Sequence, residues 1–220
     1  MSLKLKHLDN YDINLLADPE IGNTEIERER FISDSGIVFY GERKVGLSPI
    51  SFSLEFRGDK DEIRRNKNMI ADRLELEEIT FDDDIYYKGR FLGKTSKVMY
   101  KFEVVDYEGE AYAMKAKTVV KLTKDIPTRL VNDGNLKTPV KISLKGTGSN
   151  ITITGFDSDI TVKSLSGELE IDAQSGISDA KGINNVKLYS FPFIEDERLV
   201  KVSGSGTFSC EIEFRGRVIC

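Results

Sequence analysis

The sequence contains no tryptophan, only one histidine and only two cysteines among its 220 residues. A disulfide framework needs more cysteines, so Cys210 and Cys220 predict synthesis in a reducing compartment. The spacing of these two cysteines also matches no usual metal-binding pattern. No apolar run approaches the roughly 18 residues that a membrane-spanning helix needs. The first residues, MSLKLKHLDNYDI, lack the apolar segment of a secretory signal, so neither export nor a membrane partner is expected.

The chain also lacks an excess of positive charge, since its formal net charge is −5. General nucleic-acid binding rests on clustered Lys and Arg that neutralise phosphates, so sequence-specific or general nucleic-acid binding is not expected. A negatively charged passage through which DNA slides without sticking is compatible with this charge. The hydrophobic share of 39% and the charged share of 31% are those of an ordinary globular protein. The length suits one large β domain or two small ones.

Groups with catalytic or metal-binding chemistry are scarce. His7 is the only histidine, and it lies in an exposed-looking strand, so no Ser–His–Asp or Cys–His arrangement can be assembled without it. The run from Asp82 to Asp84 invites a calcium site, but it lacks the spaced loop ligands of such sites, and a solvated turn is the favoured interpretation. The same reasoning applies to Asp157 and Asp159. We therefore expect no enzyme, no metal and no cofactor.

Glycine pairs and one aromatic cluster have structural explanations. Gly146 and Gly148 lie in KGTGS, and Gly204 and Gly206 lie in SGSGT. No helix follows either pair to bind a phosphate, so tight turns between strands are the favoured interpretation. The cluster Phe191-Pro192-Phe193 is either a loop contact or a plug in the core, and the plug is favoured. Sugar sites usually offer an aromatic ring for stacking, for which tryptophan is the best surface, and this sequence has none.

One charged helix is expected in an otherwise β chain, over about residues 59–76. Asp59 can cap its N-terminus, and Asp61 and Glu62 favour its first turn. The apolar residues recur at spacings of seven and four and predict a narrow stripe that packs on a sheet: Ile63, Ile70 and Leu74. The charged outer face is either solvated or used in a subunit contact, and solvation is favoured.

A polar hairpin is predicted before the helix, from Glu25 to Leu47. Ser33-Asp34-Ser35-Gly36 has the composition of a turn between two strands. Ile26, Arg28 and Arg30 are expected on one face of the first strand, and three glutamates on the other. Such a polar strand fits poorly in a core, so the hairpin is expected to protrude alone or to pack on a neighbouring subunit.

Further strands are predicted around and after the helix. Residues 51–56 alternate as one strand. After the helix, three antiparallel strands are expected at 85–92, 98–105 and 112–122, with a turn at 106–109 (DYEG). Residues 123–139, with two prolines, form the best candidate linker.

Beyond Val140 the pattern changes to short, closely spaced strands separated by glycine and serine, which is typical of a small antiparallel sandwich of about seven or more strands. The expected strands are 140–144, 151–153, 160–162, 169–171, 186–188, 199–202 and 208–214. Two domains are thus expected, residues 1–130 and 131–220.

The order of these elements resembles the distal tail protein family of long-tailed phages of Gram-positive bacteria, a tail component and baseplate hub. In that family a strand-rich start leads to a hairpin, a helix and a strand pair with a "yy-g" pattern. The matching segments here are Glu29–Leu47, Asp61–Leu74 and Tyr86-Tyr87-Lys88-Gly89.

The second half resembles the family's galectin-like sandwich. Val140 to Ile153 (VKISLKGTGSNITI) is similar to its opening hairpin, and Glu168 to Ala173 (ELEIDA) to a later strand. Val186 to Pro192 and Leu199 to Gly204 resemble the final segments of that sandwich. The fold class that follows is mainly β, with an N-terminal β-sandwich or barrel-like domain that carries one α-helix and a C-terminal galectin-like antiparallel β-sandwich.

The resemblance implies a structural role in the virion. It implies a homohexameric ring at the tail tip, formed mainly by the N-terminal domains and assembled in the host cytoplasm. The ring would join the tail tube protein to the tail-tip hub or tail-associated lysin protein. Its central channel would pass the tape-measure protein and then DNA. The sandwich loops are short, so no inserted arm or carbohydrate-binding module is expected.

Candidate interface residues come from the predicted hairpin, which could reach around a neighbouring subunit. They are Arg30, Ile32, Ile37, Phe39 and Tyr40. The alternative function is a carbohydrate-binding module of a cell-wall adsorption apparatus, carried by the segment from Pro139 to Cys220. An enzyme ranks last, since no catalytic constellation can be assembled.

Overall fold

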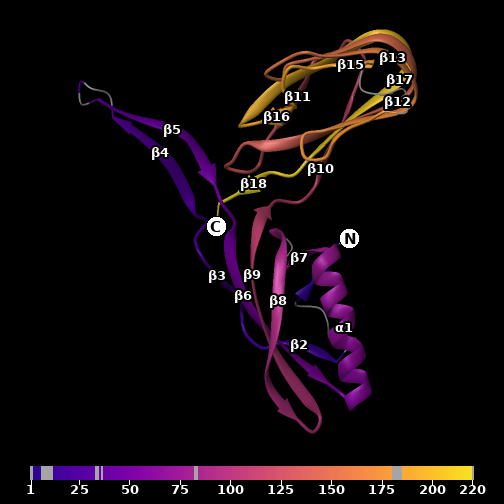
Figure 1. The fold of residues 1–220 in the computed structure, drawn as a ribbon. Helices are drawn as coiled ribbons and strands as arrows, with labels where there is room; N and C mark the ends of the chain where they lie inside the picture. The colour runs from indigo at the N-terminus through magenta and orange to yellow at the C-terminus, as the bar shows by residue number, and fades with distance from the viewer. Residues whose placement is uncertain are drawn as a thin grey trace. The chain divides into compact units, whose positions relative to one another are not determined.

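The computed structural model describes residues 2–5, 12–32, 35, 37–81, 84–179 and 185–219. The chain forms two compact units, which are described separately here. The first unit runs to Met114 and the second spans Lys115–Val218. The elements can be followed along the chain in Figure 1.

The first unit is built on a mixed sheet with the strand order β1-β7-β8-β9-β6-β2, and β3 also pairs with β6. The β1–β7 pair is parallel and the other pairs are antiparallel. The strands are β1 (Ser2–Lys4), β2 (Ile13–Leu15), β3 (Glu20–Ile21), β6 (Ser48–Arg57), β7 (Glu78–Thr80), β8 (Tyr86–Met99) and β9 (Phe102–Met114). A separate hairpin consists of β4 (Ile26–Ile32) and β5 (Val38–Val45).

The predicted helix is confirmed as α1 (Lys60–Leu76). Asp59 is its N-cap, and the predicted apolar stripe of Ile63, Ile70 and Leu74 is buried. The stripe packs against the sheet, where β6 buries every second residue. Phe52, on that buried face of β6, contacts the rings of Phe81, Phe91 and Tyr107. Successive side chains of a strand point to opposite faces of the sheet. The helix covers only one of these faces, so the other face is left uncovered by it.

The long hairpin β8–β9 corrects one sequence prediction. The turn lies at Tyr100 and Lys101, whereas the sequence suggested a turn at residues 106–109. Those residues continue β9, where Gly109 pairs with Ile50 on one side and Phe91 on the other. Two strand partners supply the hydrogen bonds that hold this glycine-containing segment extended, so tertiary pairing outweighs the local turn composition.

The second unit is an antiparallel sheet with the order β10-β17-β12-β13-β14, in which β11, β15 and β16 add pairs to β17, β13 and β12. Its strands are β10 (Thr118–Leu122), β11 (Thr128–Val131), β12 (Thr138–Thr154), β13 (Ile160–Asp172), β14 (Gly176–Asp179), β15 (Val186–Lys187), β16 (Phe193–Ile194) and β17 (Glu197–Phe214). The short strand β18 (Arg217–Val218) follows and is not part of this sheet. Residues from both ends of β12, including Ile142 and Ile153, belong to one buried cluster.

The glycine pairs lie inside strands, which corrects their interpretation as turns. Segments expected as six short strands are the two ends of β12, β13 and β17. Gly146 pairs with Gly167, and Gly148 pairs with Gly206, so the glycines of adjacent strands lie side by side. Gly146, Gly167 and Gly206 have positive φ angles of 126°, 97° and 103°. The opening "hairpin" at 140–153 is therefore one continuous strand with a glycine bend.

The mainly β fold with one helix and two principal sheets is confirmed by this topology. The division into compact units lies earlier than the expected boundary at residue 130. The reason is strand pairing: β10, which precedes that boundary, and β11, which spans it, both pair with β17. Composition identified residues 123–139 as a linker, but composition does not report partners far away in sequence.

Candidate subunit interface in the first unit

The strands β4 and β5 pair with each other as an antiparallel hairpin whose register changes along its length. Ile26 pairs with Val45, and Ile32 pairs with Val38. Between these pairs the register shifts, so that Arg28 faces Arg43 but Arg30 faces Tyr40. Two steps along β4 therefore match three along β5, which places a β-bulge in β5 and increases the local twist. Among the described strands, β4 and β5 pair only with each other.

Every residue of β4 is exposed, although the strand contains large apolar side chains. The exposed fractions are 53% for Phe31, 62% for Ile32 and 57% for Ile37, which precedes β5. Alternation along β4 separates two faces. One face carries Ile26, Arg28, Arg30 and Ile32, as expected from the sequence, and the other carries Glu27, Glu29 and Phe31. Apolar groups gathered near the free end of a charged hairpin are typical of a surface that a partner covers.

The base of the hairpin is tied to β6 by one buried polar contact and closed by one backbone hydrogen bond. The hydroxyl groups of Thr24 and Ser48 lie 2.7 Å apart in a buried hydrogen bond. The Gly46 amide donates to the carbonyl of Glu25 over 2.8 Å. A hydrogen bond shielded from water is costly to break, so the Thr24–Ser48 contact gives the hairpin a defined point of attachment.

The five candidate interface residues all lie in or beside this hairpin. The structure pairs Arg30 with Tyr40 in register and places Ile32 opposite Val38. Arg30, Ile32 and Ile37 are exposed, while the side chains of Phe39 and Tyr40 are outside the described part of the structure, as are Asp34 and Gly36 of the expected turn. Their role in a subunit contact stays a prediction.

A second surface, missed by the sequence reasoning, is the uncovered face of the first sheet. We call it the open face, and it includes Asp106, Glu108 and Glu110 of β9, Arg90, Leu92 and Lys94 of β8, and Ser51 and Ser53 of β6. Arg90 lies opposite Glu110, Lys94 lies opposite Asp106, and the Ser53 hydroxyl donates to Asp106 over 2.6 Å. The signal in the sequence was the acidic residue at every second position from 106 to 110, a strand period that the turn assignment hid.

A groove of about 1150 Å³ opens between the start of α1 and the tip of the β8–β9 hairpin. Apolar side chains line one part of it, namely Ile63, Val98, Met99 and Tyr100, and charged ones border it, namely Arg57, Asp59, Lys60, Lys101 and Glu103. The Lys67 ammonium crosses nearby from α1 to the Glu103 carboxylate at 2.7 Å. The groove has no group arranged for nucleophilic or acid–base chemistry.

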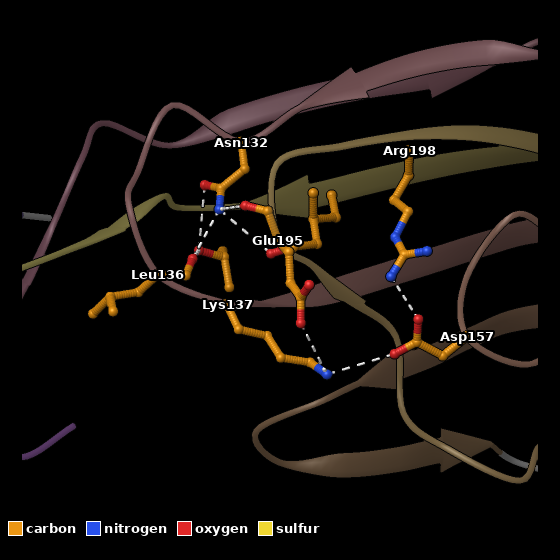
Figure 2. A network of polar contacts seen from close by, with 8 residues as sticks. Asn132, Leu136, Lys137, Asp157, Glu195 and Arg198 are labelled. Carbon is orange, nitrogen blue, oxygen red and sulfur yellow. Dashed lines mark hydrogen bonds and ion pairs between the residues drawn. The ribbon is translucent and has the colours of Figure 1, made fainter. Parts of the chain in front are cut away.

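In the second unit, a network of hydrogen bonds and ion pairs joins the polar groups around Asn132 and Asp157 (Figure 2). Asn132 is buried, and its amide nitrogen donates to the carbonyls of Leu136 at 2.8 Å and Glu195 at 2.6 Å. Its amide oxygen accepts from the Gly134 amide and the Thr138 hydroxyl. One side chain thus ties the segment after β11 to the segment after β16, which is a structural role.

Asp157, which the sequence raised as a metal ligand, is engaged by cations of the chain. Its carboxylate accepts from the Arg198 guanidinium and lies 3.5 Å from the Lys137 ammonium (Figure 2). Lys137 also lies 3.6 Å from the Glu195 carboxylate and over the Phe193 ring. No cluster of three or more His, Cys, Asp or Glu side chains suited to a metal occurs among the described residues.

The remaining sequence candidates are mostly structural. Phe191 packs against the core of the second unit and Pro192 is buried, which favours the plug over a free loop contact. Cys210 is a buried free thiol, and burial raises its pKa to about 12, so it is a poor nucleophile. His7, Asp82, Asp83 and Cys220 lie outside the described residues. Helix α1, the one helix in the described part of the chain, lacks the length and apolar character that crossing a membrane requires.

Comparisons with known proteins agree with this architecture. The sequence matches no protein-family model and no curated protein. A crystal structure of the SPP1 Dit protein, described as a paradigm of the hub adsorption apparatus in phages that infect Gram-positive bacteria, matches with a TM-score of 0.57 and 11% identity. The match covers 93% of this chain and 91% of that one.

Chains of the phage P2 baseplate match as well. In its activated conformation with Ca, the TM-score is 0.55 at 11% identity, over 94% of this chain and 91% of that chain. With Sr, the TM-score is 0.52 at 12% identity, with the same coverage. At such low identity the likeness concerns the fold. Over nearly its whole length, the chain has the fold of the SPP1 Dit protein and of a phage P2 baseplate chain, which confirms at the level of fold the resemblance to distal tail proteins.

Proposed function

We propose that this protein is a structural component of a phage tail, and that six copies form a ring at the distal end of the tail tube. In this role it joins the tube to the tail-tip hub or baseplate and has no enzymatic activity. The central opening of the ring is the passage for the tape-measure protein and then DNA. The protein is accordingly part of the virion, assembled in the host cytoplasm, and its partners are other tail proteins.

One observation carries the proposal, namely the match to the SPP1 Dit protein over 93% of this chain and 91% of that one. Agreement over both units is more informative than agreement over one sandwich, because single β-sandwiches host many unrelated functions. Function still rests on surfaces, so the hairpin and the open face are the features that connect this fold to a ring.

The hairpin supports the proposal because large apolar side chains near its end are exposed. Phe31 and Ile32 are more than half exposed on a strand that pairs only with β5. Packing the hairpin on a neighbouring copy would remove this apolar surface from water. A ring also hides the edges of an open sheet, which would otherwise be sites of uncontrolled aggregation.

The open face supports a water-filled channel. Most of its side chains are charged or small and polar, with acidic groups in the middle strand, β9, while Leu92 of β8, which lies opposite Glu108, is an exposed apolar member. A wall of mixed charge that includes carboxylates does not hold a polyanion tightly, since strong retention of DNA requires clustered cations. The proposal places this face toward the passage.

The test is the mass and symmetry of the purified full-length protein, measured by light scattering and by electron microscopy of stained particles. We expect a six-fold ring. Deleting residues 34–40 should leave a folded protein with the mass of one chain, because the hairpin would lose its end. As a control, Tyr189→Ser with Leu199→Ser removes exposed apolar groups from the second unit and should not change the mass. A deletion variant that still forms hexamers contradicts the role of the hairpin.

The sequence also left open a carbohydrate-binding module. No described contact favours it, since the charged groups beside Phe193 are paired with one another. Saturable binding of cell-wall glycans by the full-length protein, together with a single-chain mass, would support that alternative against the ring.

A further inference from the structure

The first sheet has two free edges among the described strands. At one edge, β7 pairs with β8 only through Ile79 and Tyr87, so no described strand lies beyond β8 from residue 88 onward. At the other edge, β2 and β3 pair only with β6. Two backbone hydrogen bonds also hold the chain around β2 and β3 alongside β6. The Leu16 amide donates to the Ser53 carbonyl, and the Gly22 amide donates to the Pro49 carbonyl.

These two edges carry charges of opposite sign. Strand β8, YYKGRFLGKTSKVM, contains four basic residues and no acidic one. We call its residues 88–97 the basic edge, with exposed Lys88, Arg90, Lys94 and Lys97. The segment DINLLADPEIGNTE, residues 12–25, contains no basic residue. We call it the acidic edge, with exposed Asp12, Asp18, Glu20 and Glu25.

The charges of the basic edge are available for a partner. Arg90 lies across from Glu110, and Lys94 lies across from Asp106. Lys88, Arg90 and Lys94 nevertheless form no ion pair with a described residue, while the Lys97 ammonium lies over the Phe102 ring. Apolar side chains flank the charges on both edges, since Leu92 on one and Leu16 and Ile21 on the other are exposed. A contact between the edges would therefore bury apolar surface between complementary charges.

The topology gives this contact a direction. Three antiparallel steps, β8–β9, β9–β6 and β6–β2, separate the two edges. Because the number of steps is odd, β8 runs opposite to β2. A rotation about an axis along the strands keeps each strand's direction, so it brings β8 of one copy antiparallel to β2 of the next. A contact between different surfaces of identical copies closes into a ring when the rotation closes.

We propose that the basic edge of one copy docks on the acidic edge of the next copy, and that this charge complementarity selects the head-to-tail contact of the ring. The inference rests on the proposed ring and specifies which surfaces form it. Like charges disfavour contact between two basic edges or two acidic edges, and so disfavour two-fold dimers through these edges. Assembly then weakens as salt screens the charges.

The experiment uses charge reversals in the full-length chain. One variant carries Lys88→Glu and Arg90→Glu, and the other carries Asp18→Lys and Glu20→Lys. Each alone should weaken self-association by about tenfold or more, since like charges then meet at every contact. An equal mixture of the two variants should restore the ring, because alternating copies present matching edges and an even-numbered ring can accommodate them. Lys124→Glu with Lys163→Glu, in exposed positions of the second unit, is the matched control and should assemble normally.

The outcomes separate this inference from the proposed function. Circular dichroism and thermal melting first establish that each variant is folded. If the wild type forms a ring and both reversed variants form it equally well, the edge contact is wrong and the ring stands. If folded reversed variants remain single chains in the mixture, complementarity between the edges is also wrong. A wild-type protein that stays a single chain at every concentration contradicts the ring and the edge contact together.

Discussion

Gly206 approaches the backbone of Thr147 so closely that a Cβ atom on Gly206 would lie 2.4 Å from the Thr147 carbonyl oxygen. The two residues belong to β17 and β12, which pair along most of their length. Gly206 also has a φ of 103°, a conformation that side chains other than glycine rarely adopt. The close pairing of β12 and β17 at this bend therefore requires a residue without a Cβ atom at position 206.

Gly206→Ala should lower the free energy of unfolding by about 3 kcal/mol or more, from backbone strain plus displacement of β12. Gly167→Ala is a matched control, because its φ is 97° but no atom lies within 4 Å of the added Cβ. Gly167→Ala should therefore lower the free energy of unfolding only by the backbone strain, about 1 to 2 kcal/mol. Urea denaturation of both variants measures the difference. Equal losses would show that the close approach to Thr147 contributes nothing.

The same glycines show where sequence reasoning fails. Glycine supplies both tight turns and close strand contacts, and the residues around Gly146 and Gly206 are equally compatible with either. The choice depends on the strand that lies alongside, which at Gly146 and Gly206 is about sixty residues away in the register of β12 and β17. The turn expected at residues 106–109 was wrong for the same reason, since it is held extended by β6 and β8.

The helix was predictable because its determinants are local. Asp59 accepts from the Glu62 amide at 2.9 Å, and Glu62 accepts in return from the Asp59 amide at 2.9 Å. Asp59→Ala should destabilise the protein by about 1 kcal/mol, since free amides of the first turn lose their acceptor. Glu75→Ala, at an exposed position of the same helix, should change stability by less than about 0.5 kcal/mol. Chemical denaturation measures both, and an unchanged Asp59→Ala variant would contradict the capping role.

The candidate interface was predictable in part. The alternation of charges from Glu25 to Arg30 indicates a strand unsuited to a core, and β4 is indeed exposed throughout. The basic and acidic edges were not predictable in the same way, because residues 88–97 and 12–25 become opposite edges only through the sheet order. Charge of one sign in a segment is visible in the sequence, but its position in a sheet is not.

Asn132 should be essential to the stability of the second unit. Asn132→Ala removes a buried side chain and with it the partners of part-buried backbone groups at Leu136, Glu195 and Gly134, and should lower the free energy of unfolding by about 2 to 3 kcal/mol. Lys137→Met removes ion pairs whose lysine is half exposed, and should cost less than about 1 kcal/mol. Thermal and urea unfolding measure both variants. A loss in Lys137→Met as large as in Asn132→Ala would contradict the assignment.

Stability should fall at high pH because of Tyr107. Burial raises the pKa of Tyr107 from its ordinary value of 10.0 to about 12. Above pH 10 the unfolded chain loses this proton while the folded chain keeps it, so the unfolded state binds fewer protons and unfolding becomes more favourable as pH rises. The contribution of Tyr107 to the free energy of unfolding is fully present below pH 10. It falls by up to about 2 kcal/mol as the pH approaches 12.

Tyr107→Phe should flatten this part of the pH profile, because the ring keeps its stacking on Phe52 without a titrating hydroxyl. Buried Cys210, whose pKa is raised from 9.0 to about 12, adds a decline of the same sign, which Cys210→Ala removes separately. Tyr100→Phe, at the most exposed aromatic position of the β8–β9 tip, should leave the slope unchanged. Urea midpoints measured from pH 8 to pH 12 give the comparison. A Tyr107→Phe variant with the wild-type slope would show that the buried hydroxyl is not the source of the alkaline loss.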